Sequence, residues 1–227
     1  MLTVHHLNNS RSHRVLWLLE ELGVEYQIKT YERDPQTMLA PKSLRDVHPL
    51  GKSPVITHAG HTIAESGAIL EYLVDTFGQD APTQLRPAPD TPEFLRYRYW
   101  MHYAEGSAMP ALMLRMVFDQ LPAQGPWLAR PLLAAVASAA KTQFINPQLR
   151  RHLAFWEEEL AERAYFAGDA FSAADIQMSF VLHGAVAGEA SAAKTSRARA
   201  LLRRLQARPA YERAEARGGA LDLSAFT

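Results

Sequence analysis

The sequence predicts two successive folds, a small α/β domain followed by an all-helical domain. Residues 1–77 alternate short strand-like segments with helical patterns, whereas the apolar patterns after Pro92 all have helical spacing. A proline-rich stretch separates the two regions. With 227 residues and 48% hydrophobic content, the chain is long enough to form two cores. We therefore expect domains at residues 1–78 and 93–227, joined by a linker at residues 79–92.

The first domain is expected to hold four short strands and two helices. The strands are predicted at residues 2–6, 26–31, 55–58 and 61–64. A helical pattern starts at Val15 and stops at Gly23, a residue suited to a helix C-terminus. Ala59-Gly60 signals a hairpin between the last two strands, and a second helix follows and ends near Gly78. Residues 34–48 are predicted to form a loop with one helical turn.

The order of these elements indicates how the first domain is connected. A helix joins the first two strands, so these strands should lie parallel with a right-handed crossover. The hairpin and the second helix complete the order strand, helix, strand, strand, strand, helix. This is the order of a thioredoxin-like fold.

The second domain is expected to consist of helices alone. They are predicted at residues 94–118, 131–141, 147–165, 173–183 and 197–207. Ser172 and Asp175 have the spacing of a capping box, and Phe171 before them supplies the apolar residue of a hydrophobic staple. A helix should therefore begin at Ala173.

Composition excludes several classes of function. Lys+Arg and Asp+Glu are equal at 24 each, so no charge excess draws the chain to nucleic acid or to an anionic membrane. No apolar run approaches the roughly 18 residues of a membrane span. Residues 1–5 do not resemble the start of a signal peptide, so a cytoplasmic location is expected. The nine histidines show no metal-ligand spacing, and we expect no metal.

The chain contains no cysteine. Disulfides, thiolate metal sites and a thiol nucleophile of the protein itself are therefore excluded. Any thiol chemistry must use a thiol that a ligand supplies.

Two short motifs, residues 48–55 and 64–69, carry most of the functional information. His-Pro-Leu-Gly-Lys-Ser-Pro-Val places Pro54 at the start of an apolar run, a position suited to the first residue of a strand. Ala-Glu-Ser-Gly-Ala-Ile places Glu65 and Ser66 where a helix begins, and helix N-termini attract anions. Together the motifs predict a strand end and a helix end that face one small zwitterion.

These motifs resemble those of the cytosolic-type glutathione S-transferase family. The first is similar to the family's Asn-Pro-x-Gly-x-Val-Pro-x, the second to its Glu-Ser-x-Ala-Ile, and the Phe-Ser-Ala-Ala-Asp capping box to the folding signature of its helical domain. The resemblance covers essentially the whole chain. It extends to a bacterial and fungal branch whose first loop reads Asn-Asn-Ser-Arg-Ser. Short motifs recur by chance, but three in the right order are strong.

The resemblance implies a role for each residue of the glutathione site. Pro54 would be a cis proline that leaves the backbone of Ser53 facing the cysteinyl unit. Lys52 would pair with the glycyl carboxylate. Glu65 would hold the γ-glutamyl ammonium group, and Ser66 the γ-glutamyl carboxylate. The alternative for Lys52 is a free surface lysine, and for Glu65 and Ser66 an ordinary helix start.

The group that activates the thiol is expected in the first loop. The family places a hydrogen-bond donor there, which lowers the pKa of the glutathione thiol from its usual value near 8.5. Counting back from Arg14, both Ser10 and Asn9 fall near this position. Ser10 is the favoured donor, Asn9 is the alternative, and Ser12 is expected to cap the helix.

The electrophilic second substrate is expected between the two domains, where ligand clefts are common. Tyr99, Tyr103 and Ser107 recur every four residues on one predicted helix and are expected to line its pocket. The alternative is that these aromatic residues only pack a domain interface.

The resemblance predicts a homodimeric transferase that conjugates glutathione to small hydrophobic electrophiles, with a role in detoxification. Glutathione would be a co-substrate, and no other cofactor is expected. Two alternatives remain: a glutathione-dependent peroxide or disulfide reductase, favoured if Asn9 is the donor, and a non-catalytic binding protein that keeps the fold.

Overall fold

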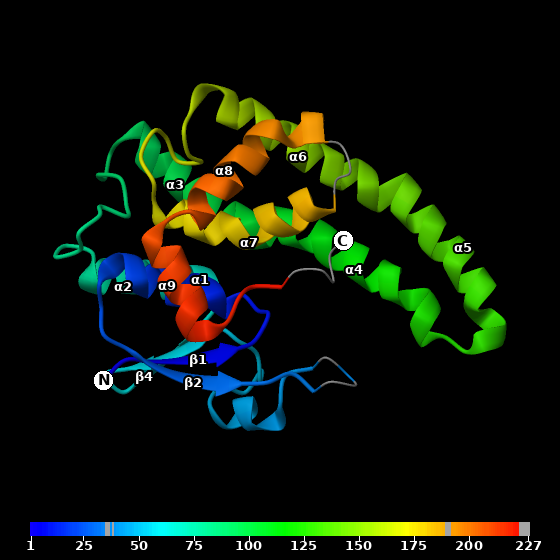
Figure 1. Cartoon of the computed structure of the whole chain (residues 1–227), viewed down its shortest axis with the longest axis horizontal. Helices are drawn as coiled ribbons and strands as arrows, with labels where there is room; N and C mark the ends of the chain where they lie inside the picture. Colours follow the sequence, from blue (N-terminus) through cyan, green and yellow to red (C-terminus); the bar gives the residue numbers. More distant parts are fainter. Residues whose placement is uncertain (35–36, 38, 189–191, 223–227) are drawn as a thin grey trace.

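The computed structural model describes residues 1–34, 37, 39–188 and 192–222. A four-stranded sheet forms the base of the molecule, and a layer of helices covers it (Figure 1). The strands are β1 (Thr3–Leu7), β2 (Gln27–Tyr31), β3 (Val55–His58) and β4 (His61–Ala64), in the spatial order β2-β1-β3-β4. The predicted first two strands are thus each placed within one residue of their observed bounds.

The sheet has the predicted mixed topology. β1 and β2 pair in parallel, with Val4 opposite Ile28, whereas β3 runs antiparallel to both β1 and β4. The crossover helix α1 (Ser12–Leu22) ends at Gly23, whose φ of 68° is left-handed and suits glycine. The predicted helical turn of the following loop is a 3-10 helix at Lys42–Asp46. The thioredoxin-like fold of this part of the chain is confirmed.

The remaining elements are helical. Within the described residues, the α-helices among them are α2 (Ser66–Phe77), α3 (Pro92–Tyr103), α4 (Met109–Gln124), α5 (Arg130–Ala140), α6 (Asn146–Glu162), α7 (Ala173–Ala187), α8 (Ser196–Gln206) and α9 (Pro209–Gly218). The shorter helical segments are Ala104–Ala108, Trp127–Ala129, Lys141–Ile145 and Ala192–Thr195. α1 and α2 lie between the sheet and the other helices, and α7 packs against both of them (Figure 1). The expected all-helical second part is confirmed. The exact boundaries of the two domains and their linker stay predictions.

Two predictions about the helices need correction. The helix predicted at residues 94–118 is two helices, α3 and α4, joined by a π-helical turn at Ala104–Ala108. No helix was predicted at α9, because its only buried residues are Ala210, Tyr211 and Ala214, which make a weak apolar pattern. α9 nevertheless packs along α1.

The predicted capping box at the start of α7 is present. The carboxylate of Asp175 accepts hydrogen bonds from the backbone N–H groups of Ser172, at 2.9 Å, and Phe166, at 3.0 Å. Burial raises the pKa of Asp175 to about 6, although these hydrogen bonds act in the opposite direction. The side chain therefore fixes both the helix start and the loop that precedes it.

Candidate glutathione site

A hollow lies where the loop before β3 meets the start of α2. It is lined by Arg11, His48, Leu50, Lys52, Ser53, Pro54, Ala64, Glu65 and Ser66. The structure therefore brings together the five residues that the sequence motifs predicted for glutathione. The enclosed volume is about 50 Å³, room for one functional group, so that the rest of a tripeptide would lie along the open side.

The loop before β3 is shaped by two neighbouring residues. The Ser53–Pro54 peptide bond is cis, as predicted, and Pro54 is buried directly before the first residue of β3. The Ser53 hydroxyl donates a hydrogen bond of 2.9 Å to the carbonyl of His5 on β1. This bond fixes the loop to the neighbouring strand. Lys52, which directly precedes Ser53, is exposed at the edge of the hollow.

Glu65 and Ser66 form the wall of the hollow at the start of α2. Glu65 has a φ of 71°, a left-handed conformation that is unfavourable for a residue with a side chain. Such strain costs about 1–3 kcal/mol and is typical of ligand sites. Glu65 is exposed, whereas Ser66 is buried and is the first residue of the helix. The side chains are thus placed at the positive end of the helix dipole.

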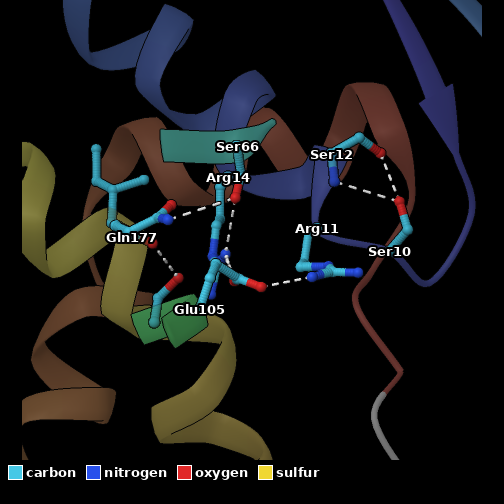
Figure 2. A network of polar contacts seen from close by, with 9 residues as sticks. Ser10, Arg11, Ser12, Arg14, Ser66, Glu105 and Gln177 are labelled. Carbon is cyan, nitrogen blue, oxygen red and sulfur yellow. Dashed lines mark hydrogen bonds and ion pairs between the residues drawn. The ribbon is translucent and has the colours of Figure 1, made fainter. Parts of the chain in front are cut away.

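A polar network lies directly behind Ser66 (Figure 2). Its hydroxyl accepts hydrogen bonds from Nη1 of Arg14, at 3.3 Å, and from Nε2 of Gln177, at 3.4 Å. Arg14 Nη1 also forms an ion pair of 2.5 Å with Oε1 of Glu105. The other carboxylate oxygen of Glu105 binds Nη1 of Arg11, also at 2.5 Å. Residues of the helical part therefore reach the wall of the hollow.

The charges of this network shift the pKa values of its members. Burial alone would raise the pKa of Glu105, but the charges of Arg14 and Arg11 outweigh burial and lower it. Burial lowers the pKa of Arg14, and the charge of Glu105 offsets part of this effect. The carboxylate of Glu105 is therefore ionised and holds both guanidinium groups.

The two candidate thiol donors of the first loop, Ser10 and Asn9, are not among the residues that line the hollow in the described structure. Ser10 is buried, its Oγ lies 2.8 Å from Oγ of Ser12, and it accepts the backbone N–H of Ser12 at 3.2 Å. Asn9 has a φ of 49°, and its side-chain oxygen accepts the N–H of Asp222 at 3.0 Å. The residue of this loop that lines the hollow is Arg11.

The expectation that Ser12 caps α1 is wrong. Ser12 is the first helical residue, and Arg11 occupies the cap position without a side-chain cap. The Ser12 hydroxyl instead lies 2.9 Å from Nδ1 of His6, and His6 Nε2 lies 2.8 Å from the carbonyl of Gly218. These contacts connect the first loop to β1 and to the end of α9.

The residues predicted for the second substrate share a separate hollow. Tyr99, Tyr103 and Ser107 line it together with Leu95, Arg98, His102 and Gly106, and its volume is about 530 Å³. In the described part of the chain, this hollow and the candidate glutathione hollow between the loop before β3 and the start of α2 have no lining residue in common. Gly106 and Ser107 nevertheless follow Glu105 directly, and Glu105 contacts Arg11.

Both tyrosines of this hollow also have packing roles. The rings of Tyr99 and Tyr103 stack with centroids 5.4 Å apart. The Tyr103 hydroxyl contacts Nδ1 of His152 and accepts a hydrogen bond of 3.2 Å from Nε1 of Trp156. Burial raises the pKa of this hydroxyl to about 12. These contacts join α3 to α6 within the helical part of the chain, so they are not the domain interface that the sequence offered as an alternative.

Sequence reasoning missed Arg11 and Glu105. Arg11 belongs to the Asn-Asn-Ser-Arg-Ser loop, in which only Ser10, Asn9 and Ser12 were given a role, and Glu105 lies in the middle of an otherwise ordinary helical pattern. Only the fold brings the two together, across 94 positions of the chain. The one hint in the sequence was that Glu105 lies on the same predicted helix as Tyr99 and Tyr103.

The described residues hold neither a cluster of metal ligands nor a helix that could span a membrane. No group of three or more potential metal ligands occurs there. In the same part of the chain, no helix combines the length and the apolar character needed to cross a bilayer.

Comparison with known proteins identifies the family. Residues 1–75 match the glutathione S-transferase N-terminal domain, and residues 109–209 match the C-terminal domain. Glutathione S-transferase 3 of Schizosaccharomyces pombe is 38% identical over 185 residues, which cover 82% of this chain and 74% of that protein. Glutathione S-transferase 1 of Saccharomyces cerevisiae is 32% identical over 190 residues, or 80% of each chain.

A solved structure agrees with these matches. The crystal structure of a glutathione S-transferase from Actinobacillus pleuropneumoniae superposes with a TM-score of 0.82 at 30% identity, covering 99% of this chain and 96% of that one. The chain therefore belongs to the glutathione S-transferase family and is a glutathione transferase.

Proposed function

We propose that the chain conjugates the thiolate of glutathione to small hydrophobic electrophiles. The observation that carries this proposal is the single hollow that joins Lys52, the Ser53–Pro54 turn and the Glu65–Ser66 helix start. A zwitterionic tripeptide fits such a set. The glycyl carboxylate faces Lys52, the cysteinyl backbone pairs with Ser53, and the γ-glutamyl group lies between Glu65 and Ser66.

The reaction requires ionisation of the glutathione thiol. The thiol proton passes to water, and a sulfur lone pair forms the new C–S bond. The electrons of the broken bond leave with the leaving group, or remain on an activated alkene that water then protonates. The protein binds the thiol in place and stabilises its anion. Because the chain has no cysteine, the nucleophile belongs entirely to the co-substrate.

We propose a donor to the thiolate from the first loop, with Ser10 and Asn9 as the two candidates. Both lie beside the N-terminus of α1, whose free N–H groups also favour an anion. The Ser10 hydroxyl is paired with the hydroxyl of Ser12, so it would have to turn to reach the sulfur. Asn9 would offer its amide N–H₂ group, since its oxygen is engaged by Asp222.

The experiment combines calorimetry of glutathione binding with ultraviolet absorbance of the bound thiolate. Binding with a thiolate signal at neutral pH, and turnover of an activated chloronitrobenzene, is the expected result. Ser10→Ala and Asn9→Ala identify the donor by loss of that signal, with the exposed Ser43→Ala as the control. Binding without thiolate would favour a reductase or a carrier. Absence of binding would contradict the proposal.

We further propose that the electrophile binds at the hollow around Tyr99, Tyr103 and Ser107. Its aromatic lining and volume suit a small hydrophobic molecule. The proposed physiological role is detoxification. We place the reaction in the cytoplasm, where glutathione is the main thiol buffer.

A homodimer is also proposed. Several large apolar side chains on α3, α4 and α5 are exposed, among them Leu95, Val117 and Leu132. Scattered exposed apolar residues are normal, but this many on neighbouring helices favours an interface. Sedimentation analysis of the purified protein tests it, and a monomer at micromolar concentration would contradict it.

A further inference from the structure

Three side chains, Ser10, Ser12 and His6, form a buried relay of hydrogen bonds between the first loop and β1. Oγ of Ser10 lies 2.8 Å from Oγ of Ser12, which lies 2.9 Å from Nδ1 of His6. Nε2 of His6 lies 2.8 Å from the carbonyl oxygen of Gly218, the last residue of α9. All three side chains are buried, and Figure 2 shows the pair of serines. The relay therefore begins at one candidate thiol donor and ends at an imidazole.

The direction of these hydrogen bonds follows from the end at Gly218. A carbonyl oxygen only accepts, so Nε2 of neutral His6 carries the proton and Nδ1 is an acceptor. Ser12 has one hydroxyl proton, and Nδ1 is its nearer acceptor, because the carbonyl oxygen of Leu7 lies 3.2 Å away. The Ser12 oxygen then accepts the proton of Ser10. While His6 is neutral, the Ser10 hydroxyl proton therefore points toward Ser12.

The Ser10 oxygen keeps one lone pair for a proton from a ligand. It accepts the backbone N–H of Ser12 at 3.2 Å, and a hydroxyl oxygen can accept two hydrogen bonds. A thiol that donates to the second lone pair has a path for its proton. The thiol proton moves to Ser10, the Ser10 proton to Ser12 and the Ser12 proton to Nδ1 of His6. The products are a thiolate, a Ser10 hydroxyl that now donates to it, and an imidazolium that still donates to Gly218.

His6 is neutral before this transfer. Burial lowers its pKa below the ordinary value of 6.5, and the hydrogen bond to the backbone of Gly218 opposes burial in part. A thiolate at the other end of the relay favours the charged imidazole, because an opposite charge nearby raises the pKa of a histidine. Proton uptake by His6 is thus coupled to ionisation of the thiol.

The titratable groups around the imidazole of the relay leave this coupling intact. Burial lowers the pKa of His13 on α1 to about 4, so that His13 is uncharged at neutral pH and repels no added proton. α7 brings His183, whose pKa burial lowers, and Glu215 of α9 and Asp222 oppose that shift. The neighbouring strand β2 places the uncharged Thr30 opposite the imidazole.

We propose that His6 is a positioning residue for the thiol of glutathione: acting through Ser12, it takes up the thiol proton and turns the Ser10 hydroxyl toward the thiolate. This inference rests on the proposed function and on Ser10 as the donor. The proton stays on His6 while the thiolate exists, and it returns along the relay to water once the new C–S bond has formed. The Ser12 hydroxyl is available for this role because it does not cap α1. Activated nucleophiles in enzymes commonly depend on such a base and a third group that orients it.

The first test measures the pKa of the bound thiol from the pH dependence of the thiolate absorbance. His6→Asn keeps an oxygen acceptor for Ser12 but cannot take up a proton. It should raise this pKa toward the free value near 8.5, so that the thiolate fraction near pH 6.5 falls by roughly 10-fold. Turnover should fall in parallel and recover near pH 9, where the thiol ionises unaided. At about pH 5, where the bound thiol is protonated, the Kd for glutathione should change by less than about threefold.

The second test counts protons. Calorimetry in two buffers of different ionisation enthalpy gives the number of protons released when glutathione binds, and absorbance of the same sample gives the number of thiolates formed. The wild-type protein should release fewer protons than it forms thiolates, because His6 retains them. In His6→Asn and in Ser12→Ala, which interrupts the relay, the two numbers should be equal.

Controls separate this inference from the proposed function. His13→Asn removes a buried histidine outside the relay and should change neither the thiol pKa nor the proton count. If His6→Asn leaves the thiol pKa unchanged, or if the wild-type protein releases as many protons as it forms thiolates, the inference is wrong while the proposed function stands. Where a variant loses glutathione binding at every pH, the wild-type proton count decides alone. If the wild-type protein binds no glutathione or forms no thiolate, the inference and the proposed function are both wrong.

Discussion

Arg208, at the start of α9, binds Glu21 of α1 through two parallel hydrogen bonds, Nε to Oε1 at 2.6 Å and Nη2 to Oε2 at 2.9 Å. Glu21 is buried and also accepts the indole N–H of Trp17 at 2.9 Å. The guanidinium carbon of Arg208 lies 3.7 Å from the centre of the Phe171 ring. One side chain thus connects the end of the helical part to the first helix and to the capping box of α7.

Replacing Arg208 should be strongly destabilising. Arg208→Ala leaves Glu21 buried without its cation, and such a loss costs about 3–5 kcal/mol of unfolding free energy. Arg208→Lys keeps the charge but not the paired geometry, so its cost should be intermediate. Denaturant unfolding measures both. The control is Arg213→Ala on the same helix: Arg213 is half-exposed and its partner Glu20 keeps Arg217, so about 1 kcal/mol or less is expected. Equal effects at the two positions would contradict this ranking.

The sequence pattern did not predict the helix α9 or its position on α1. The fold of residues 1–78 was predictable for two reasons. Apolar residues recur there with the spacing of a strand or a helix, and Gly23 and Ala59-Gly60 mark a helix end and a hairpin turn. Only Ala210, Tyr211 and Ala214 of α9 are buried, and the helix is also held by ion pairs such as Arg208–Glu21, whose partners lie 187 residues apart. No local pattern encodes such a pair.

The sequence likewise predicted only part of the proposed glutathione site. Lys52, Ser53 and Pro54, like Glu65 and Ser66, belong to continuous motifs, so the sequence alone grouped them. Arg11 needs Glu105 to define its direction, and the hydroxyl of Ser10 is oriented by Ser12 and, through it, by His6. These orientations depend on packing between distant elements, which is why the choice between Ser10 and Asn9 stayed open.

Of the two residues of the capping box, Asp175 should contribute more than Ser172 to the free energy of unfolding. Asp175→Ala removes the acceptor for the backbone N–H groups of Ser172 and Phe166, both in buried surroundings. An unsatisfied buried donor costs about 1–3 kcal/mol, so a loss of about 3 kcal/mol or more in unfolding free energy is expected. Ser172→Ala keeps both acceptor contacts and should cost about 1 kcal/mol. Thermal and denaturant unfolding of the two variants would decide, and a larger effect at Ser172 would show that the hydroxyl, not the carboxylate, organises this helix start.

Acid should destabilise the protein through its buried histidines. Burial lowers the pKa of His13, packed 4.8 Å from the ring of Tyr211, from 6.5 to about 4. His13 is therefore protonated near pH 6.5 in the unfolded chain, but only near pH 4 in the folded protein. The contribution of neutral His13 to the free energy of unfolding is fully present above pH 6.5. It is lost as the pH falls toward 4, and the loss is about 3 kcal/mol at most.

The measurement is the unfolding free energy between pH 7 and pH 4 for the wild-type protein and His13→Gln. The slope should be flatter in the variant, by at most about 1.4 kcal/mol per pH unit. Comparison between variants is needed because the raised pKa of Asp175, about 6, acts in the opposite direction below that pH. His61→Gln, at an exposed position on β4, should keep the wild-type slope. An unchanged slope in His13→Gln would exclude this histidine as the source.

Tyr99 offers the sharpest test of where the electrophile binds. The side chain is 49% exposed in the hollow, and its ring stacks on Tyr103. Stacking of an aromatic electrophile on such a surface contributes about 0.5–1.5 kcal/mol, so Tyr99→Ala should raise the KM for an activated chloronitrobenzene by roughly 2- to 10-fold. The KM for glutathione should stay within about twofold, because Tyr99 does not line the proposed glutathione hollow of the described structure.

Phe144→Ala, which removes another exposed aromatic ring outside both hollows, should leave both constants unchanged. If Tyr99→Ala alters unfolding free energy but neither constant, the tyrosine serves packing alone, and the electrophile binds elsewhere.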